Sequence, residues 1–327
     1  MRKAALLAFC LSLLVSAHAQ HGRGFVVDGE GTIVGFVGFP EHGLIIPSYV
    51  DDIPVTAIGD IAFQDALLRH VVISEGISVI GDRAFFRNPM NSVVIPGTVT
   101  VIGSGAFVGN QLSSVVIPAS VRYIGFAAFA ENPIAGVTMS YGTVYIGGRA
   151  FLNNQLQSVE IPQSVVFIGE AAFAFNELSS VAIPAHAYIG ASAFISNQLN
   201  SVEIADGVTA IGARAFAGNQ LSAVVIPDSV TVIGERAFGD SPIRKITIGA
   251  GVELSQNERI PSFENAFDSF YNRNGKEAGT FLFINGRWRT ADSVAQNRRN
   301  GILAGAVVLL LVIGIALAAK TRRKKMS

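Results

Sequence analysis

The sequence repeats the phrase Ile-Gly-x-x-Ala-Phe nine times at a spacing of 22 residues, with one step of 21 between Gly169 and Gly190. A fixed period in this range identifies a solenoid, in which each repeat is one structural unit stacked on the next. Solenoids offer long, regular surfaces for partners and seldom supply the convergent pocket that an enzyme needs. The repeated glycines are Gly59, Gly81, Gly103, Gly125, Gly147, Gly169, Gly190, Gly212 and Gly234.

One copy shows how a coil is built. Val115 and Ile117 alternate with Val116, a period of two in β-branched residues that predicts a short strand with one face inward. Pro118 ends this strand because it lacks a ladder donor. A second extended segment then returns apolar side chains to the core. We therefore predict a β-rich repeat solenoid with one parallel sheet of short strands, and extended or 3₁₀ segments on the other side.

Two further columns are explained by the stack. The glycine of the repeat permits a backbone bend, and Ala-Phe places one small and one large side chain in the interior, on a helical or 3₁₀ turn. Three residues after most of these phenylalanines stands an asparagine, whose amide both donates to and accepts from the backbone of neighbouring coils. A glycan-binding role for this row is the weaker interpretation. The row is Asn88, Asn110, Asn132, Asn154, Asn176, Asn197 and Asn219.

The pattern Ile-Pro-x-x-Val-x-x-Ile-Gly-x-x-Ala-Phe, with a leucine two residues after each of five asparagines, resembles the BspA-like, treponemal-type leucine-rich-repeat family. The resemblance covers about residues 25–290. It implies a bacterial surface or envelope solenoid of the leucine-rich-repeat type, in a family often implicated in adhesion to host proteins or other cells. A small thiol often occupies the asparagine position in that family, so the polar ladder differs here. The leucines are Leu112, Leu156, Leu178, Leu199 and Leu221.

Both ends of the chain carry export signals. A basic start, a short apolar run and Ala17-His18-Ala19 predict a signal peptide at residues 1–19, and its removal leaves a protein without cysteine. Residues 301–319 are uncharged and apolar, and the five basic residues of the tail at 320–327 follow them, so we predict a single membrane-spanning helix with a cytoplasmic tail. A buried core helix and a sorting-type tail are the weaker alternatives.

Capping segments flank the repeats. We predict an N-terminal cap at 20–46, the solenoid at 47–250, a degenerate repeat with a C-terminal cap at 251–290, and a linker at 291–300. Asp28-Gly29-Glu30-Gly31 predicts the turn of one hairpin, and Ile284-Asn285-Gly286 the turn of another that holds Trp288. Such caps cover coil edges that would otherwise invite aggregation.

Charge and composition narrow the function. Seven of the 24 basic residues lie in the signal and the tail, so the 24 acidic residues outnumber the other basic residues by seven, which disfavours nucleic-acid binding. The histidines lack metal-ligand spacing, and no catalytic constellation or cofactor motif is present. We therefore predict no enzyme activity, no cofactor and no metal.

Two variable columns are candidate partner-binding sites. The residue before each Ile-Gly is aromatic in four consecutive coils, Tyr123, Tyr145, Phe167 and Tyr188. Coils stack about 4.8 Å apart, so these rings would form a strip roughly 15 Å long, and aromatic residues are enriched at binding hot spots. The favoured interpretation is still that the rings only stack on one another and stabilise the solenoid.

The second column is the outward middle position of the longer strand. It holds valine in three consecutive coils, Val72, Val94 and Val116, which predicts an apolar stripe for a partner. Plain β-propensity explains the same residues and is the favoured interpretation.

The leading hypothesis is a non-catalytic ectodomain, exported and held by one C-terminal helix, that binds an extracellular or periplasmic protein ligand. The alternative is a structural envelope protein that acts as a spacer or assembles laterally. An enzyme is a distant third.

Overall fold

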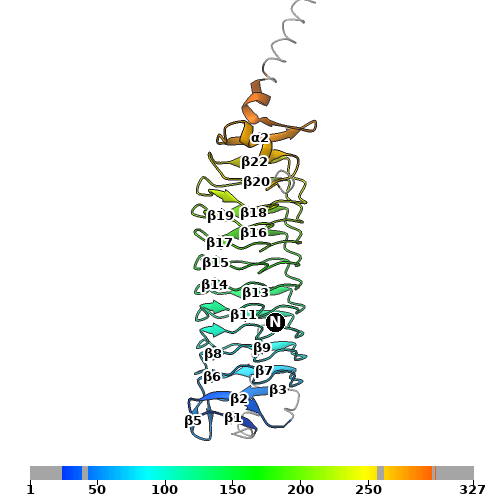
Figure 1. The fold of residues 1–327 in the computed structure, drawn as a ribbon. Helices are drawn as coiled ribbons and strands as arrows, with labels where there is room; N and C mark the ends of the chain where they lie inside the picture. Colours follow the sequence, from blue (N-terminus) through cyan, green and yellow to red (C-terminus); the bar gives the residue numbers. More distant parts are fainter. Residues whose placement is uncertain (1–23, 39–42, 256–260, 297–298, 300–327) are drawn as a thin grey trace, which may run out of the picture.

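The computed structural model describes residues 24–38, 43–255, 261–296 and 299. The chain winds into a straight stack of coils, with antiparallel caps at both ends (Figure 1). The predicted signal peptide, membrane span and tail lie outside the described residues. Within the described ranges, no helix has the length and apolar character needed to cross a membrane.

A continuous sheet runs along one side of the stack. It is built mainly from two-residue strands, each formed by the Ile before the repeated glycine and the residue preceding it (Figure 1). Repeats of nearly constant length place equivalent residues opposite one another in parallel register, as in Val101 with Tyr123. The sheet contains β1 (Phe25–Val27), β2 (Thr32–Phe36), β6 (Ala57–Ile58), β8 (Val79–Ile80), β10 (Val101–Ile102), β12 (Tyr123–Ile124), β14 (Tyr145–Ile146), β15 (Phe167–Ile168), β17 (Tyr188–Ile189), β19 (Ala210–Ile211) and β21 (Val232–Ile233).

The longer strands predicted from the sequence form a second row, and this row is interrupted. The prediction of one parallel sheet is therefore incomplete: the segments expected merely to be extended form the continuous sheet, because their backbones meet the neighbouring coil at every turn. The second row divides into β3 (Gly43–Ile46), β7 (His70–Ile73) and β9 (Ser92–Val94); β11 (Ser114–Ile117) and β13 (Gly136–Met139); β16 (Ser180–Ile183) and β18 (Ser201–Ile204); and β20 (Ala223–Val225), β22 (Lys245–Ile248), β23 (Gly279–Ile284) and β24 (Arg287–Thr290).

The repeated glycine is needed for close packing between coils, and the predicted bend is not the main reason for it. None of the nine has a positive φ. A Cβ built on Gly125 would lie 2.5 Å from the carbonyl carbon of Gly103 in the preceding coil. From Gly81 to Gly234, each repeated glycine would meet preceding backbone at 2.4–2.7 Å. The glycine column is therefore a line of backbone-to-backbone contact.

The sequence predicts a helical or 3₁₀ turn after each glycine, and this prediction is wrong: the turn is neither. Ala127 and Glu131 have φ of 53° and 57°, in the left-handed region. Alternate amides of the turn instead donate to the next coil, with Ala127, Phe129 and Glu131 bonding the carbonyls of Gly148, Ala150 and Leu152 at 2.8–2.9 Å. These bonds between coils hold the backbone in a conformation that side chains ordinarily disfavour.

A column of phenylalanines forms the centre of the core. Neighbouring rings lie 4.8–5.5 Å apart between centroids, with interplanar angles of 4–15°. Phe25 and Phe267 close the ends of the column edge-on. Full burial of each such ring contributes roughly 1.5–3 kcal/mol. The column is Phe63, Phe85, Phe107, Phe129, Phe151, Phe173, Phe194, Phe216, Phe238 and Phe263.

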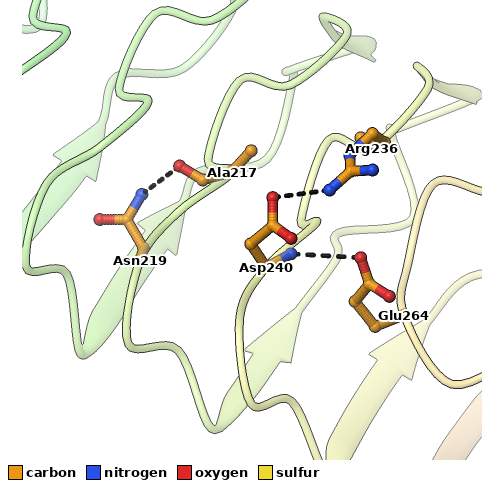
Figure 2. A network of polar contacts seen from close by, with 5 residues as sticks. All are labelled: Ala217, Asn219, Arg236, Asp240 and Glu264. Atoms are coloured by element: carbon orange, nitrogen blue, oxygen red, sulfur yellow. Dashed lines mark hydrogen bonds and ion pairs between the residues drawn. The ribbon is translucent and has the colours of Figure 1, made fainter.

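The predicted asparagine ladder is present and buried. The Asn219 side-chain amide donates to the carbonyls of Phe194, Phe216 and Ala217 at 3.0, 2.9 and 3.3 Å; Figure 2 shows the last of these bonds. Its Oδ1 accepts from the Leu199 amide at 2.9 Å. Each asparagine thus pairs buried backbone groups of two coils.

An antiparallel hairpin of β1 and β2 covers the first coil, at the residues where the sequence predicted one. Asp28 supports its turn, since its carboxylate accepts from the amides of Glu30 and Thr32. A second small hairpin, β4 (Tyr49–Val50) with β5 (Ile53–Pro54), extends beside the first coil.

The other end is closed by β23, β24 and the short helix α2 (Phe267–Arg273). The hairpin turns through Asn285 and Gly286, both with positive φ, as predicted from the sequence. Trp288 donates its indole N–H to the carbonyl of Asn265 at 3.0 Å. Residues 291–296 are helical, where the sequence predicted a linker.

Carboxylates replace backbone carbonyls where the regular stack ends. The Gly218 amide donates to the Gly239 carbonyl of the next coil, whereas the equivalent Asp240 amide donates to the Glu264 carboxylate at 3.2 Å (Figure 2). The Asp240 carboxylate pairs with Arg236 at 2.6 Å. The loop before α2 uses Asp268 in the same way, and burial raises the pKa of that carboxyl although it accepts two backbone amides.

Thr143 is a polar residue at a core position that several other coils fill with valine. It is fully buried in the column that holds Val121 and Val165, and its hydroxyl has no hydrogen-bond partner among the residues that the structure describes. Because a buried unpaired hydroxyl costs about 1–3 kcal/mol, we expect Thr143→Val to raise the free energy of unfolding by about 1–2 kcal/mol in urea denaturation. Val121→Thr should lower it similarly. A destabilising effect of Thr143→Val would contradict this account.

Candidate functional site

The four aromatic residues predicted as a binding strip lie together. They occupy the first positions of β12, β14, β15 and β17 in the continuous sheet, and the rings of Tyr123, Tyr145, Phe167 and Tyr188 are stacked with centroid separations of 4.7, 4.5 and 5.2 Å. Interplanar angles are 11°, 2° and 13°. We call these four residues the aromatic strip.

The shortened repeat does not interrupt the aromatic strip. Three residues separate Pro184 from Tyr188, against four between Pro162 and Phe167. The missing residue is thus lost before the strand begins, and Phe167 still pairs with Tyr188 in parallel register. The stack is therefore continuous across four coils.

The aromatic strip is partly exposed. Tyr123 and Tyr188 at its ends are 39% and 49% exposed, and the two rings between them are half-buried. Because the rings cover one another's faces, their edges and the tyrosine hydroxyls are what the strip offers to a partner. Partial burial raises the pKa of Tyr123, with Tyr145 and Asp82 adding to the shift, so this hydroxyl is a neutral donor at neutral pH.

Two exposed apolar residues in these coils were not predicted from the sequence as candidate site residues. Val166 precedes Phe167 and is 49% exposed, and its carbonyl accepts from the Tyr188 amide. Phe126 follows the glycine of the Tyr123 coil and is 49% exposed, with the Arg149 guanidinium 5.4 Å from its ring centroid. The variable position after Ile-Gly was the signal for Phe126, because the stack does not require an aromatic residue there.

The predicted valine stripe is divided between two sheets. Val72 pairs with Val94 in β7 and β9, whereas Val116 pairs with Thr138 in β11 and β13. Val116 and Val94 are 62% and 41% exposed, and Val72 is half-buried. In Figure 1 the strands that carry these valines lie on the opposite side of the stack from β14, β15 and β17. The valine stripe and the aromatic strip therefore belong to different sheets.

The described residues hold no group of three or more His, Cys, Asp or Glu side chains arranged for a metal ion. Most of the hydrogen-bonded polar side chains in the described stack pair with backbone groups, as in Asp82, whose carboxylate accepts from the Ser104 amide at 2.6 Å. The arrangement at the aromatic strip is suited to contact with a partner surface, through ring edges, hydroxyls and flanking valine.

Parallel coils in register, an internal phenylalanine column and capped ends define the class: a parallel β-solenoid repeat protein of about ten turns. The sequence matches the BspA-type leucine-rich repeat region, in six copies, over residues 56–179 and 187–274. The chain therefore belongs to the BspA-type leucine-rich repeat family.

One solved structure shows the same fold, and two others are similar to this chain with lower TM-scores. A leucine-rich repeat protein from Bacteroides ovatus is 24% identical, with a TM-score of 0.57; the match covers 70% of this chain and 63% of that one, less than two thirds of its length. The pneumococcal vaccine antigen PcpA is 19% identical with a TM-score of 0.45, over 71% of this chain and 78% of that one. A leucine-rich cell surface protein from Faecalibacterium prausnitzii is 22% identical with a TM-score of 0.37, over 70% and 87%.

A comparison with curated proteins finds no match.

Proposed function

We propose that this protein is a non-catalytic binding protein whose solenoid is exported, held at a bacterial membrane by the apolar segment 301–319, and engages an extracellular or periplasmic protein ligand. The aromatic strip carries the proposal. Four stacked rings give a rigid contact surface with little side-chain entropy to lose on binding.

The strip does more than its structural role requires. The stack tolerates Ala57, Val79, Val101, Ala210 and Val232 at the same position in other coils, so aromatic residues are not needed for the coil to form. Large, partly exposed rings, with exposed Val166 and Phe126 in the same coils, give these coils apolar surface together with tyrosine hydroxyls, a composition typical of protein-binding surfaces.

Export and surface display rest on the signal at 1–19, on the apolar segment and on family. Members of the BspA-type family are bacterial cell-surface proteins, which supports an extracytoplasmic location for this chain. Protease treatment of intact cells separates two locations, since a surface ectodomain is digested and a periplasmic one is protected.

A structural role as a spacer is the second candidate, because the solenoid is a straight rod with both ends capped (Figure 1). Ten turns at about 4.8 Å span roughly 45–50 Å. Caps disfavour end-to-end growth, so assembly in this case would be lateral. A monomer in solution with saturable affinity for one ligand would count against this role.

The aromatic strip is tested by replacing Tyr123, Tyr145, Phe167 and Tyr188 together with serine. We expect affinity for the ligand, screened among extracellular-matrix and partner-cell proteins, to fall about 30-fold or more, because central aromatic anchors are typically worth 2 kcal/mol or more. Binding is measured by surface plasmon resonance, and circular dichroism reports the fold.

The matched control replaces Val94 and Val116 with serine, on the second row of strands, and should leave binding unchanged. Unchanged binding by the folded strip variant would remove the strip from the proposal. Loss of binding by the valine control alone would transfer the site to the valine stripe.

A further inference from the structure

A polar hollow opens between the loops of two adjacent coils, in the segment that follows the left-handed turn. Its volume is about 330 Å³. It belongs to a different segment of the coil from the aromatic strip, after the turn and before the longer strand. It is lined by Glu131, Asn132, Pro133, Asn153, Asn154 and Gln155.

Some side chains that line the hollow are held by hydrogen bonds within the fold, and others are available to contact a ligand. Asn154 is held by the ladder, because its amide donates to the carbonyl of Phe129 at 3.0 Å and its Oδ1 accepts from the Ile134 amide at 3.1 Å. Glu131, Asn153 and Gln155 are exposed. Their side chains make no hydrogen bond within the described residues that would commit them to the fold. A carboxylate and two carboxamides therefore surround the hollow with donors and acceptors ready for a ligand.

An exposed aromatic ring continues the same column. The Asn153 amide donates to the Ala174 carbonyl, which places Phe175 one coil beyond Asn153. Phe175 is 55% exposed and has a φ of 55°, a conformation costly for a bulky residue. Ser196 and Gly218 fill the same position in the next two coils. The left-handed backbone is common to this position in the coils from Asp65 to Asp240, so the stack sets the conformation. Nothing in the packing of the stack requires a phenylalanine there, since serine and glycine serve in the next two coils.

The charge of the loops that line this edge of the solenoid indicates what kind of ligand fits there. The loops 131–135, 153–157, 175–179, 196–200 and 218–222 contain no lysine or arginine and carry glutamates at 131 and 177. An anionic ligand would meet like charge with no cation to offset it. Carboxamide and carboxylate groups instead pair with vicinal hydroxyls, and an exposed ring packs on the apolar face of a pyranose.

We propose that this edge binds a neutral oligosaccharide, with Glu131, Asn153 and Gln155 contacting its hydroxyls and Phe175 packing on a neighbouring sugar ring. The repeat supports a linear ligand, since each coil presents its polar loop at a regular interval of about 4.8 Å. This site is independent of the aromatic strip and of the protein ligand proposed above.

The test is isothermal titration of the full protein with cellohexaose, chitohexaose and maltohexaose, and with a heparin hexasaccharide as the anionic comparison. We expect at least one neutral hexasaccharide to bind and the heparin hexasaccharide not to bind. Phe175→Ser and Gln155→Ala should each weaken that binding about tenfold, equivalent to about 1.4 kcal/mol. Either variant alone suffices if the other fails to fold.

Two controls separate the sites. Val225→Ser alters an exposed residue on the second row of strands, and Tyr188→Ser alters the aromatic strip; both should bind the oligosaccharide as the unmodified protein does. The proposal is overturned if none of the neutral hexasaccharides binds, if only the heparin hexasaccharide binds, or if the folded Phe175→Ser and Gln155→Ala proteins retain full affinity. None of these results bears on the protein ligand of the strip.

Discussion

Gly125→Ala is expected to lower the free energy of unfolding by about 3 kcal/mol or more, near the upper end of what a single methyl group does. The added Cβ would lie 2.5 Å from the carbonyl carbon of Gly103 and 2.6 Å from the amide nitrogen of Ser104. Both contacts are backbone atoms of the preceding coil, so no side chain can rotate away. The coils would have to separate, which would lengthen the hydrogen bonds between their strands.

Urea denaturation followed by circular dichroism measures this effect, and Gly136→Ala is its matched control. Gly136 lies in β13 of the next repeat, and a Cβ there meets no atom within 4 Å. We expect its replacement to change stability by no more than about 0.5 kcal/mol. Equal effects at the two positions would mean that close approach of the coils does not explain the glycine column.

Asn197→Ala should lower the free energy of unfolding by about 3–4 kcal/mol. Its amide donates to the carbonyls of Phe173 and Phe194 at 2.9 and 3.1 Å, and its Oδ1 accepts from the Leu178 amide at 3.0 Å. The alanine variant would leave that buried amide without a partner, in a place where the neighbouring coils exclude water. The cost is therefore the desolvation of backbone groups rather than the loss of one side-chain contact.

Asn200→Ala provides the comparison, three residues along the chain. Asn200 is exposed and its side chain makes no hydrogen bond within the described residues, so its loss should change the denaturation midpoint little. An Asn197→Ala protein as stable as the Asn200→Ala protein would show that the ladder is dispensable. Partial unfolding confined to the coils around Asn197 would be consistent with the nearest-neighbour energetics of repeat proteins.

Much of the architecture could be predicted because the same residue type recurs at the same position of each repeat. The period identified the solenoid, and the Phe and Asn columns were correctly placed in its interior. The reason for the glycine was not predictable, because the distance between backbones of neighbouring coils depends on how they stack. The hydrogen bonding of Tyr123-Ile124 to the next coil was missed because two residues are too few to show a strand periodicity.

The candidate sites divide in the same way. The aromatic strip was visible as four aromatic residues in one column of the sequence, and the structure stacks their rings at 4.5–5.2 Å. Phe126 and Phe175 were overlooked because single aromatic residues do not stand out in an apolar sequence. The polar hollow had no sequence signal, since it is made by exposed side chains of two coils whose proximity exists only in the stack.

Sequence alone determined the fold class, the identity of the core columns and the length of each repeat, because these follow from periodicity and burial. Tertiary structure decided which segments pair into the continuous sheet, why glycine is required, and which variable residues face outward together. Those properties depend on contacts between residues about 22 positions apart. A one-dimensional pattern lists such residues, and only the stacking of the coils brings them into contact.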